Sequence, residues 1–378
     1  MLWNSSLRLD GPFARGRFFI TSSRPWYFPP INFDERAQEN AGLKREAQAG
    51  SLLSKMPEIL PALTTLVLDL YAEEPRDDDK LQPKLGVPLP VFLALFSIPL
   101  LRHFSVMGRI FHPTDDPSAF PVDISLPPLV SFEYTLDNLR SHPRASKTEM
   151  ELLNRLIPRL HLSLETLHIP SESAPLRAMY NRDWPRLHTF SMYGQRRTVS
   201  KPLIPYILLL ARMPGLRTLH LLFANPEKLS PQPIWPRGFP AAYPWRKLEE
   251  LTVTQPHAED ELWCHLPSGL RYLSLRCWPR QSMILANDHE YGLLPQLKLG
   301  WHTPLLSTAE MYGVLLSCNT PNLTNLDIEY RADSDNEGEL LEHIAQGFPS
   351  LEVLQLRRYH PRDGEVNESL VSDTVGIH

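Results

Sequence analysis

Pro321-Asn-Leu-Thr-Asn-Leu-Asp-Ile328 decides the fold, because the phrase Pro-x-Leu-x-x-(Leu/Phe)-x-aliphatic recurs along the 378-residue chain. Alternate side chains of a strand point to opposite faces. Each phrase therefore predicts a short strand that buries its leucines and turns the intervening residues outward. Copies or close variants begin at Pro61, Pro99, Pro127, Pro185, Pro214 and Pro349, and phrases without that proline surround Leu164, Leu248, Leu270 and Leu294.

The spacing of these phrases predicts a repeat architecture. Their first leucines, from Leu63 to Leu351, lie 22–38 residues apart, with a mean of about 29. Units of roughly 20–29 residues that open on Leu-x-x-Leu-x-Leu are typical of leucine-rich repeats. One unit cannot bury its apolar face alone, so neighbouring units must stack their strands side by side. We expect an α/β leucine-rich repeat solenoid, a horseshoe or arc with irregular repeats of about 22–38 residues.

Return segments between the strands favour this fold over a propeller or a sandwich. Apolar residues at helical spacing predict helices over 147–157, 203–213, 308–318 and 337–348, with Asp335 as the N-cap of the last.

Three regions follow from the extent of the repeat. Residues 1–50 lack the phrase and are expected to be an N-terminal cap or extension; the alternative is a docking segment for another protein. Residues 51–360 form the array, and residues 361–378 are expected to be a flexible polar tail.

Composition excludes several classes of protein. Hydrophobic residues make up 42% and the net charge is −5, which indicates a folded protein without the basic stripe of a nucleic-acid binder. Arg196-Arg197 is only a short exposed basic pair. The three cysteines lack metal-ligand spacing. We therefore expect buried or free thiols in a reducing compartment. We find no secretory signal or membrane span, and expect a cytoplasmic and/or nuclear protein with no membrane partner.

Neither a catalytic motif nor a metal site is evident, so we expect a non-enzymatic protein without a cofactor. Glycine-rich phosphate loops, Gly-x-Ser-x-Gly and His-Glu-x-x-His are missing. His103, His168 and His220 fall on equivalent strand positions of repeats too far apart to share one ion. Residues 333–338 resemble a calcium loop, but Ile344 stands where a glutamate is required.

The outward residues of the strands form the predicted protein-binding surface, the concave face of the sheet. They are polar and of mixed charge, which also suits plain solubility. The candidates are Asp69, His103, Ser105, Glu133, His168, Tyr193, His220, Glu250, Thr252, Tyr272, Arg276, Asp327, Glu329, Gln355 and Arg357.

In several phrases an apolar residue stands directly before the opening proline, and this feature gives a family resemblance. Over residues 50–360 the chain resembles the repeat region of fungal F-box/leucine-rich repeat proteins, as shown by Ile98-Pro99, Trp184-Pro185, Met213-Pro214 and Phe348-Pro349. The resemblance implies a substrate receptor of a Skp1–cullin ubiquitin ligase, in which the repeats hold the substrate and an F-box holds Skp1.

The F-box itself is not found in this sequence. The nearest match, Met56-Pro-Glu-Ile-Leu60, lacks one spacer residue and runs into the first strand phrase. Skp1 is thus an expected partner only if an F-box precedes Met1. The chain is either a truncated form or a repeat protein that never had the box. The alternative function is a regulatory or structural leucine-rich repeat protein with no ligase link.

Overall fold

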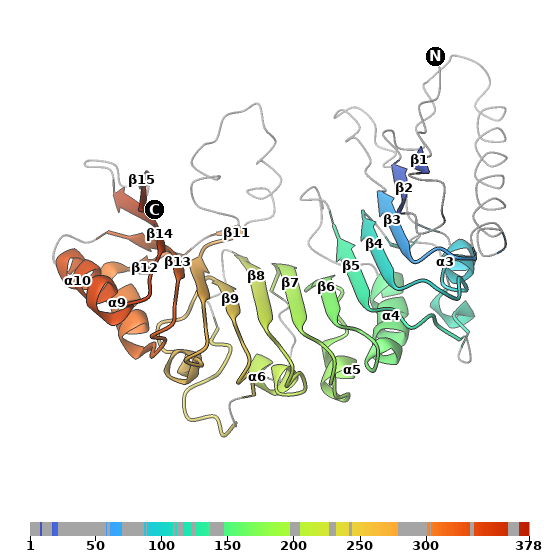
Figure 1. The fold of residues 1–378 in the computed structure, drawn as a ribbon, viewed down its shortest axis with the longest axis horizontal. Coiled ribbons are helices and arrows are strands. Elements are labelled where there is room, and N and C mark those ends of the chain that lie inside the picture. Colours follow the sequence, from blue (N-terminus) through green and yellow to red (C-terminus); the bar gives the residue numbers. More distant parts are fainter. Residues whose placement is uncertain are drawn as a thin grey trace, which may run out of the picture. The chain divides into compact units, whose positions relative to one another are not determined.

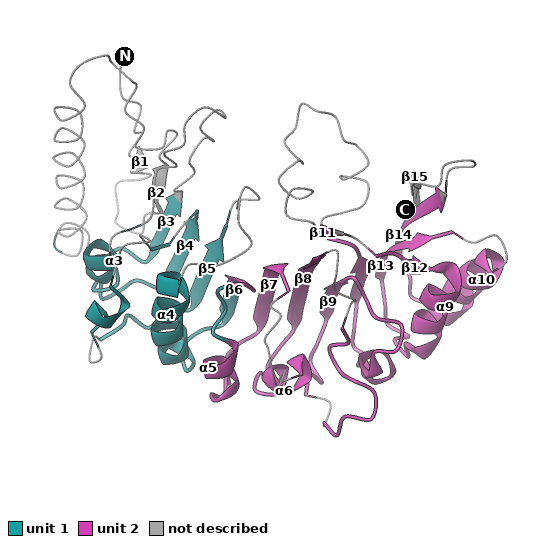
Figure 2. Ribbon diagram, turned by 180° about the vertical axis from the view of Figure 1, so that it is seen from behind, with its two compact units in different colours: residues 1–137, 144–168, 173–175 teal, residues 138–143, 169–172, 176–378 magenta. Residues whose placement is uncertain are grey.

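The computed structural model describes residues 8–9, 17–21, 58, 61–69, 87, 89–108, 110–111, 116–121, 125–136, 147–196, 205–226, 232–241, 244–278, 301–302, 304–332, 336–361 and 370–377. The chain divides into two compact units (Figure 2). Unit 1 comprises residues 1–137, 144–168 and 173–175, and unit 2 comprises residues 138–143, 169–172 and 176–378.

Unit 1 alternates strands with short helices. Its elements are β1 (Arg8–Leu9), β2 (Arg17–Thr21), β3 (Thr65–Asp69), α3 (Leu89–Leu95), β4 (His103–Met107), the 3-10 helix η1 (Pro117–Ala119), β5 (Ser131–Thr135), α4 (Lys147–Leu156), η2 (Ile157–Leu160) and the first residues of β6 (Thr166–Pro170). The strands β2 to β6 pair in parallel and in chain order, whereas β1 pairs antiparallel with β2.

Unit 2 continues the same alternation (Figure 1). It contains α5 (Leu176–Tyr180), β7 (Thr189–Gln195), α6 (Tyr206–Leu210), β8 (Thr218–Pro226), β9 (Glu250–Thr254), η3 (Glu261–His265), β10 (Tyr272–Arg276), β11 (Trp301–His302), β12 (Leu306–Ser307), α9 (Thr308–Ser317), β13 (Asn325–Arg331), α10 (Glu337–Gly347), β14 (Val353–Pro361) and β15 (Leu370–Ile377). Here β7, β8, β9, β10, β13 and β14 pair in parallel.

The predicted strands form at ten of the eleven phrases, each beginning two residues after the anchoring leucine. The expectation of an α/β protein built on parallel strands is therefore confirmed, and the leucine-rich repeat assignment remains a prediction.

A backbone ladder explains how successive phrases are held together. The residue after each anchor donates its N–H to the equivalent carbonyl of the preceding strand: Arg217 to His188, Glu249 to Arg217 and Arg271 to Glu249, each at 2.8 Å. The next N–H shares the same carbonyl oxygen, as Tyr272 does with Glu249 at 3.0 Å. This position thus needs a backbone donor.

The phrase at Leu294 differs from the prediction of eleven adjacent strands. It lies outside the described residues, but β10 pairs directly with β13, and Thr324 donates to Arg271 at 2.9 Å. No further strand therefore separates those two phrases. Pro295 occupies the donor position after Leu294 and has no N–H, which is a physical reason for its exclusion.

The four predicted helices are present with altered ends. Helix α6 spans Tyr206–Leu210 instead of 203–213, with Pro205 as its N-cap and Ala211 as its C-cap. Helix α4 ends one residue early, where η2 begins with Pro158 as its second residue. Asn336 holds the N-cap position of α10 without a side-chain bond, and Asp335 lies outside the described residues.

The buried face of each unit is a stack of the phrases' apolar residues. In unit 1, Phe104 and Phe132 are paired across β4 and β5, with ring centroids 5.7 Å apart. In unit 2 the corresponding row runs through Phe190, Leu219, Leu251, Leu273, Leu326 and Leu354, all buried.

Strands also form near the two ends of the chain. Within residues 1–50, β2 adds a strand parallel to β3. Within the expected flexible tail, Leu370–Ile377 forms β15, which pairs antiparallel with β14 along eight residues. Valine and isoleucine in β15 favour this extended conformation.

Candidate protein-binding face

The outward residues of unit 2 line up in three rows across the strands, which we call the polar rows. Register places Glu250 beside Tyr272 in the first row, and Ser274 between Thr252 and Asp327 in the second. The first row is Thr189, Thr218, Glu250, Tyr272, Asn325 and Val353, and the second is Ser191, His220, Thr252, Ser274, Asp327 and Gln355. The third row holds the residues two positions further along these strands, which are paired as Tyr193 with Leu222, Thr254 with Arg276, and Glu329 with Arg357.

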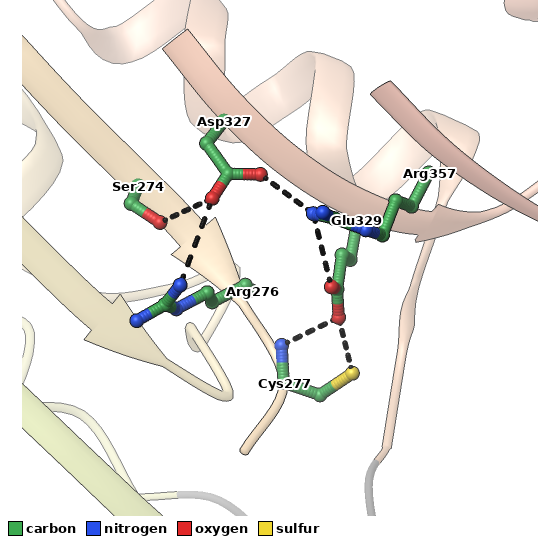
Figure 3. A network of polar contacts seen from close by, with 6 residues as sticks. All are labelled: Ser274, Arg276, Cys277, Asp327, Glu329 and Arg357. Carbon is green, nitrogen blue, oxygen red and sulfur yellow. Dashed lines mark hydrogen bonds and ion pairs between the residues drawn. The ribbon is translucent and has the colours of Figure 1, made fainter. Parts of the chain in front are cut away.

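Two carboxylates of β13 lie buried in the second and third of these rows (Figure 3). Asp327 and Glu329 are 4% and 2% exposed, although both point away from the apolar core. Burying a charge is costly unless it is paired and hydrogen-bonded. The surroundings of both carboxylates meet this requirement.

Asp327 accepts hydrogen bonds from both neighbouring strands. Ser274 Oγ on β10 donates to Oδ2 at 3.1 Å, and Arg357 Nη1 on β14 donates to Oδ1 at 3.1 Å. Arg276 Nη1 lies 3.9 Å from Oδ2 and completes an ion pair.

Glu329 is held by the end of β10 and by the same arginine. Both the backbone N–H and the thiol of Cys277 donate to Oε2, at 3.1 and 2.6 Å. Arg357 Nη1 lies 3.5 Å from Oε1. Two carboxylates thus face two guanidiniums, and the formal charges cancel.

This network pairs both arginines with buried carboxylates. The side chains of Arg276 and Arg357 are 25% and 19% exposed, so each contacts a carboxylate below and also reaches solvent. Tyr272 is half-buried two rows away from the arginines, Glu250 is exposed beside Tyr272, and Gln355 is exposed in the second row. The arrangement can present planar donors and an aromatic ring to another molecule at low cost in side-chain entropy.

His220 sits in the second row beside Thr252. Burial lowers the pKa of His220 below its ordinary value; Glu250 opposes this shift and Arg276 adds to it. The imidazole is therefore neutral near pH 7.

The candidates of unit 1 form a separate, more open group. Ser105, Glu133 and His168 are neighbours across β4, β5 and β6, and Glu133 is exposed. His103 pairs with Ser131 in the adjacent row, and Asp69 lies opposite Met107, with its side chain outside the described part.

This register corrects the equivalence expected of the three histidines. His103 stands two residues after its anchor, whereas His168 and His220 stand four residues after theirs. In the part of the chain that the structure describes, no group of three metal-ligating side chains is placed to hold an ion.

Arg196 is likewise not the exposed residue expected from the sequence. Its guanidinium lies 5.2 Å from the centroid of the Tyr206 ring and 5.6 Å from that of Phe223. It donates to the carbonyls of Gln232 and Pro233. Burial lowers the pKa of Arg196, against the opposing effects of Tyr206 and Asp260.

Cys277 is the site residue that the sequence analysis missed, having been assigned only as a buried or free thiol. It follows the last residue of β10, so strand alternation no longer determines its direction. In the sequence, the one signal for Cys277 is that it directly follows Arg276, the last outward residue of β10.

In comparisons with known proteins, no family model matches the chain and no curated protein matches its sequence. None of the described helices has both the length and the apolar character needed to cross a membrane.

Proposed function

We propose that this chain is a non-enzymatic leucine-rich repeat scaffold that binds a protein partner through the polar rows of unit 2. One observation carries the proposal. Tyr272 and Arg276 on β10 and Arg357 on β14 are outward residues of one sheet face, and a buried, charge-balanced network pairs both arginines with carboxylates of β13. Tyrosine and arginine are the residue types that most often dominate binding energy at protein interfaces.

The resemblance of the repeats supplies the biological setting of the proposal. The partner on the concave face would be a substrate for ubiquitination, recruited in the cytoplasm or nucleus to a Skp1–cullin ligase. The second candidate is a regulatory or structural repeat protein that uses the same face without a ligase. The unusual spacing of 22–38 residues favours the irregular arrays of the F-box group.

The face is tested by quantitative affinity capture with the full-length chain and two variants. Tyr272→Ala combined with Gln355→Ala changes the polar rows, and Arg212→Ala changes an exposed ion pair with Asp183 elsewhere in unit 2. We expect the Tyr272→Ala, Gln355→Ala variant to capture at least about tenfold less of the proteins that the wild-type chain retains. Equal capture by all three forms would contradict binding through the polar rows.

The ligase setting is tested separately with purified Skp1. Direct association of Skp1 with the full chain, measured by calorimetry, is the expected result of the ligase proposal. A chain that retains its partners but shows no heat of binding with Skp1 would favour the second candidate.

A further inference from the structure

Four parallel strands of unit 2 begin on the same edge of the sheet, and each carries an exposed cation beside its anchoring leucine. Strands β7 to β10 pair in register, so their first residues are neighbours. The cation stands directly before the anchor of β7 and β9, and directly after the anchor of β8 and β10. We call these four residues the basic edge: Arg186, Arg217, Lys247 and Arg271.

The backbone ladder fixes the spacing of the basic edge. Glu249 donates its N–H to the carbonyl of Arg217, and Arg271 donates to the carbonyl of Glu249, both at 2.8 Å. Neighbouring strands are about 4.8 Å apart, so the four strands span about 14 Å. In the sequence the four cations lie 24–31 positions apart, and no basic run is visible there. The repeat therefore brings together charges that the sequence separates.

The turns around the basic edge are positively charged, although the net charge of the chain is −5. From five residues before each anchor to two residues after it, the four turns have seven arginines and lysines and three acidic residues. Asp183 pairs with Arg212 at 3.1 Å, and Glu249 Oε1 lies 3.5 Å from Arg217 Nη1. The third acid, Glu250, is exposed. Exposed ion pairs are weak, so an incoming anion can compete with them.

The limits of the basic edge favour a peptide over a nucleic acid. The turns that lead into β13 and β14 have neither arginine nor lysine, so the basic edge ends at β10. Trp184 and Trp245, in the turns before β7 and β9, are fully buried. Neither indole can stack on a base, as aromatic side chains do in proteins that bind single-stranded nucleic acid.

We propose that the basic edge binds a short acidic segment of a partner protein, a run of about five aspartates or glutamates in an extended conformation. Such a run matches the basic edge in length, because five extended residues span about 14 Å. Its carboxylates would accept charge-assisted hydrogen bonds from the three guanidiniums and from the ammonium of Lys247. The proposal goes beyond the polar rows, which contain none of these four cations.

The probe is a dye-labelled peptide of six glutamates, titrated with the full-length chain and followed by fluorescence anisotropy. A peptide of six glutamines controls for backbone contacts, and an oligonucleotide of six thymidines controls for negative charge alone. We expect the glutamate peptide to bind at least about tenfold more tightly than the glutamine peptide, and more tightly than the oligonucleotide. Raising the NaCl concentration from about 50 to about 250 mM should weaken its binding at least about threefold.

Variants locate the binding site of the peptide. Lys247→Glu combined with Arg271→Glu reverses two neighbouring charges and should weaken binding by about tenfold or more. Arg237→Glu combined with Arg331→Glu is the matched control, because it changes the net charge equally at two exposed residues outside the basic edge. The control should keep binding within about twofold of wild type. Circular dichroism checks that both variants are folded, and Lys247→Ala with Arg271→Ala, expected to weaken binding about threefold, replaces the charge reversal if it does not fold.

Three results would overturn the proposal. The first is that the glutamate peptide does not bind at about 50 mM NaCl. The second is an equal loss of binding in the two charge-reversal variants, since only the overall charge of the chain would then matter. The third is binding of the oligonucleotide as tightly as the peptide, because the basic edge would then select no peptide. None of these results bears on the polar rows, which the Tyr272→Ala, Gln355→Ala variant tests.

Discussion

Glu133 in unit 1 and Asp327 in unit 2 occupy the same place in their phrases, yet their environments are opposite. Each lies between two buried residues of its strand, Phe132 and Tyr134 or Leu326 and Ile328. Glu133 is exposed and accepts from Ser131 Oγ at 3.0 Å. Asp327 is 4% exposed and faces one hydroxyl and two guanidiniums.

The difference comes from the next row of each unit. In unit 1 that row holds Met107 and Thr135, which offer no cation. In unit 2 the corresponding positions are Arg276, Glu329 and Arg357. Both arginines form ion pairs with Asp327, and Arg357 also pairs with Glu329. An outward strand position is therefore solvated or buried according to the length and charge of the side chains beside it.

The largest expected effect is that of Arg357→Met, which removes the cation shared by the two carboxylates. Breaking a buried ion pair by deleting one partner costs about 3–5 kcal/mol, and we expect the lower end because Arg276 remains near Asp327. Thermal unfolding should show the loss, and hydrogen exchange should accelerate in β13 and β14. A change below about 1 kcal/mol would mean that the network is only a surface ion pair.

Much of the fold could be predicted from the phrases, because leucine at fixed offsets specifies both the strand and its buried side. The exclusion of the Leu294 phrase was also accessible in principle. Its Pro295 occupies the position at which Arg217, Glu249 and Arg271 donate to the preceding strand. Counting leucines without asking which backbone donors the ladder needs placed a strand between β10 and β13, which pair directly.

The site was less predictable than the fold. Strand alternation correctly predicted that Asp327 and Arg276 point to the same face of the sheet. Their burial, however, depends on which repeats become neighbours. Here β10 pairs with β13 across more than forty intervening residues. The role of Cys277 depends on the same pairing, since Glu329 reaches it only across these two strands.

A smaller effect is expected from Ser274→Ala, which removes a neutral donor from Asp327 and leaves both arginines in place. A hydrogen bond to a charged group contributes about 1.5–3 kcal/mol. We expect about 1.5 kcal/mol, measured by thermal unfolding, because the arginines still satisfy the carboxylate. Thr252→Ala, in the same row on β9, is the matched control. Equal losses from the two variants would assign the effect to strand packing instead.

The pH dependence of His220 should be smaller again, because this side chain is only partly buried. Burial lowers its folded-state pKa below the unfolded value of about 6.5. Above that pH both states are neutral; as pH falls below it, the unfolded chain binds the proton first and stability decreases. The fall in melting temperature from pH 7.5 to 5.5 should therefore be smaller in His220→Gln. An identical fall in both proteins would show that His220 does not contribute.

Glu133→Gln in unit 1 should have almost no effect, and this result makes the comparison with Asp327 quantitative. The side chain is exposed, and an amide oxygen can still accept from Ser131 Oγ. Surface substitutions of this kind change stability by about 0.5 kcal/mol or less. Asp327→Asn is the matched change in unit 2, where Arg276 would lose its carboxylate partner and Arg357 would lose one of its two. If thermal unfolding gave the same loss for both variants, the neighbouring row would not decide which outward charge is buried.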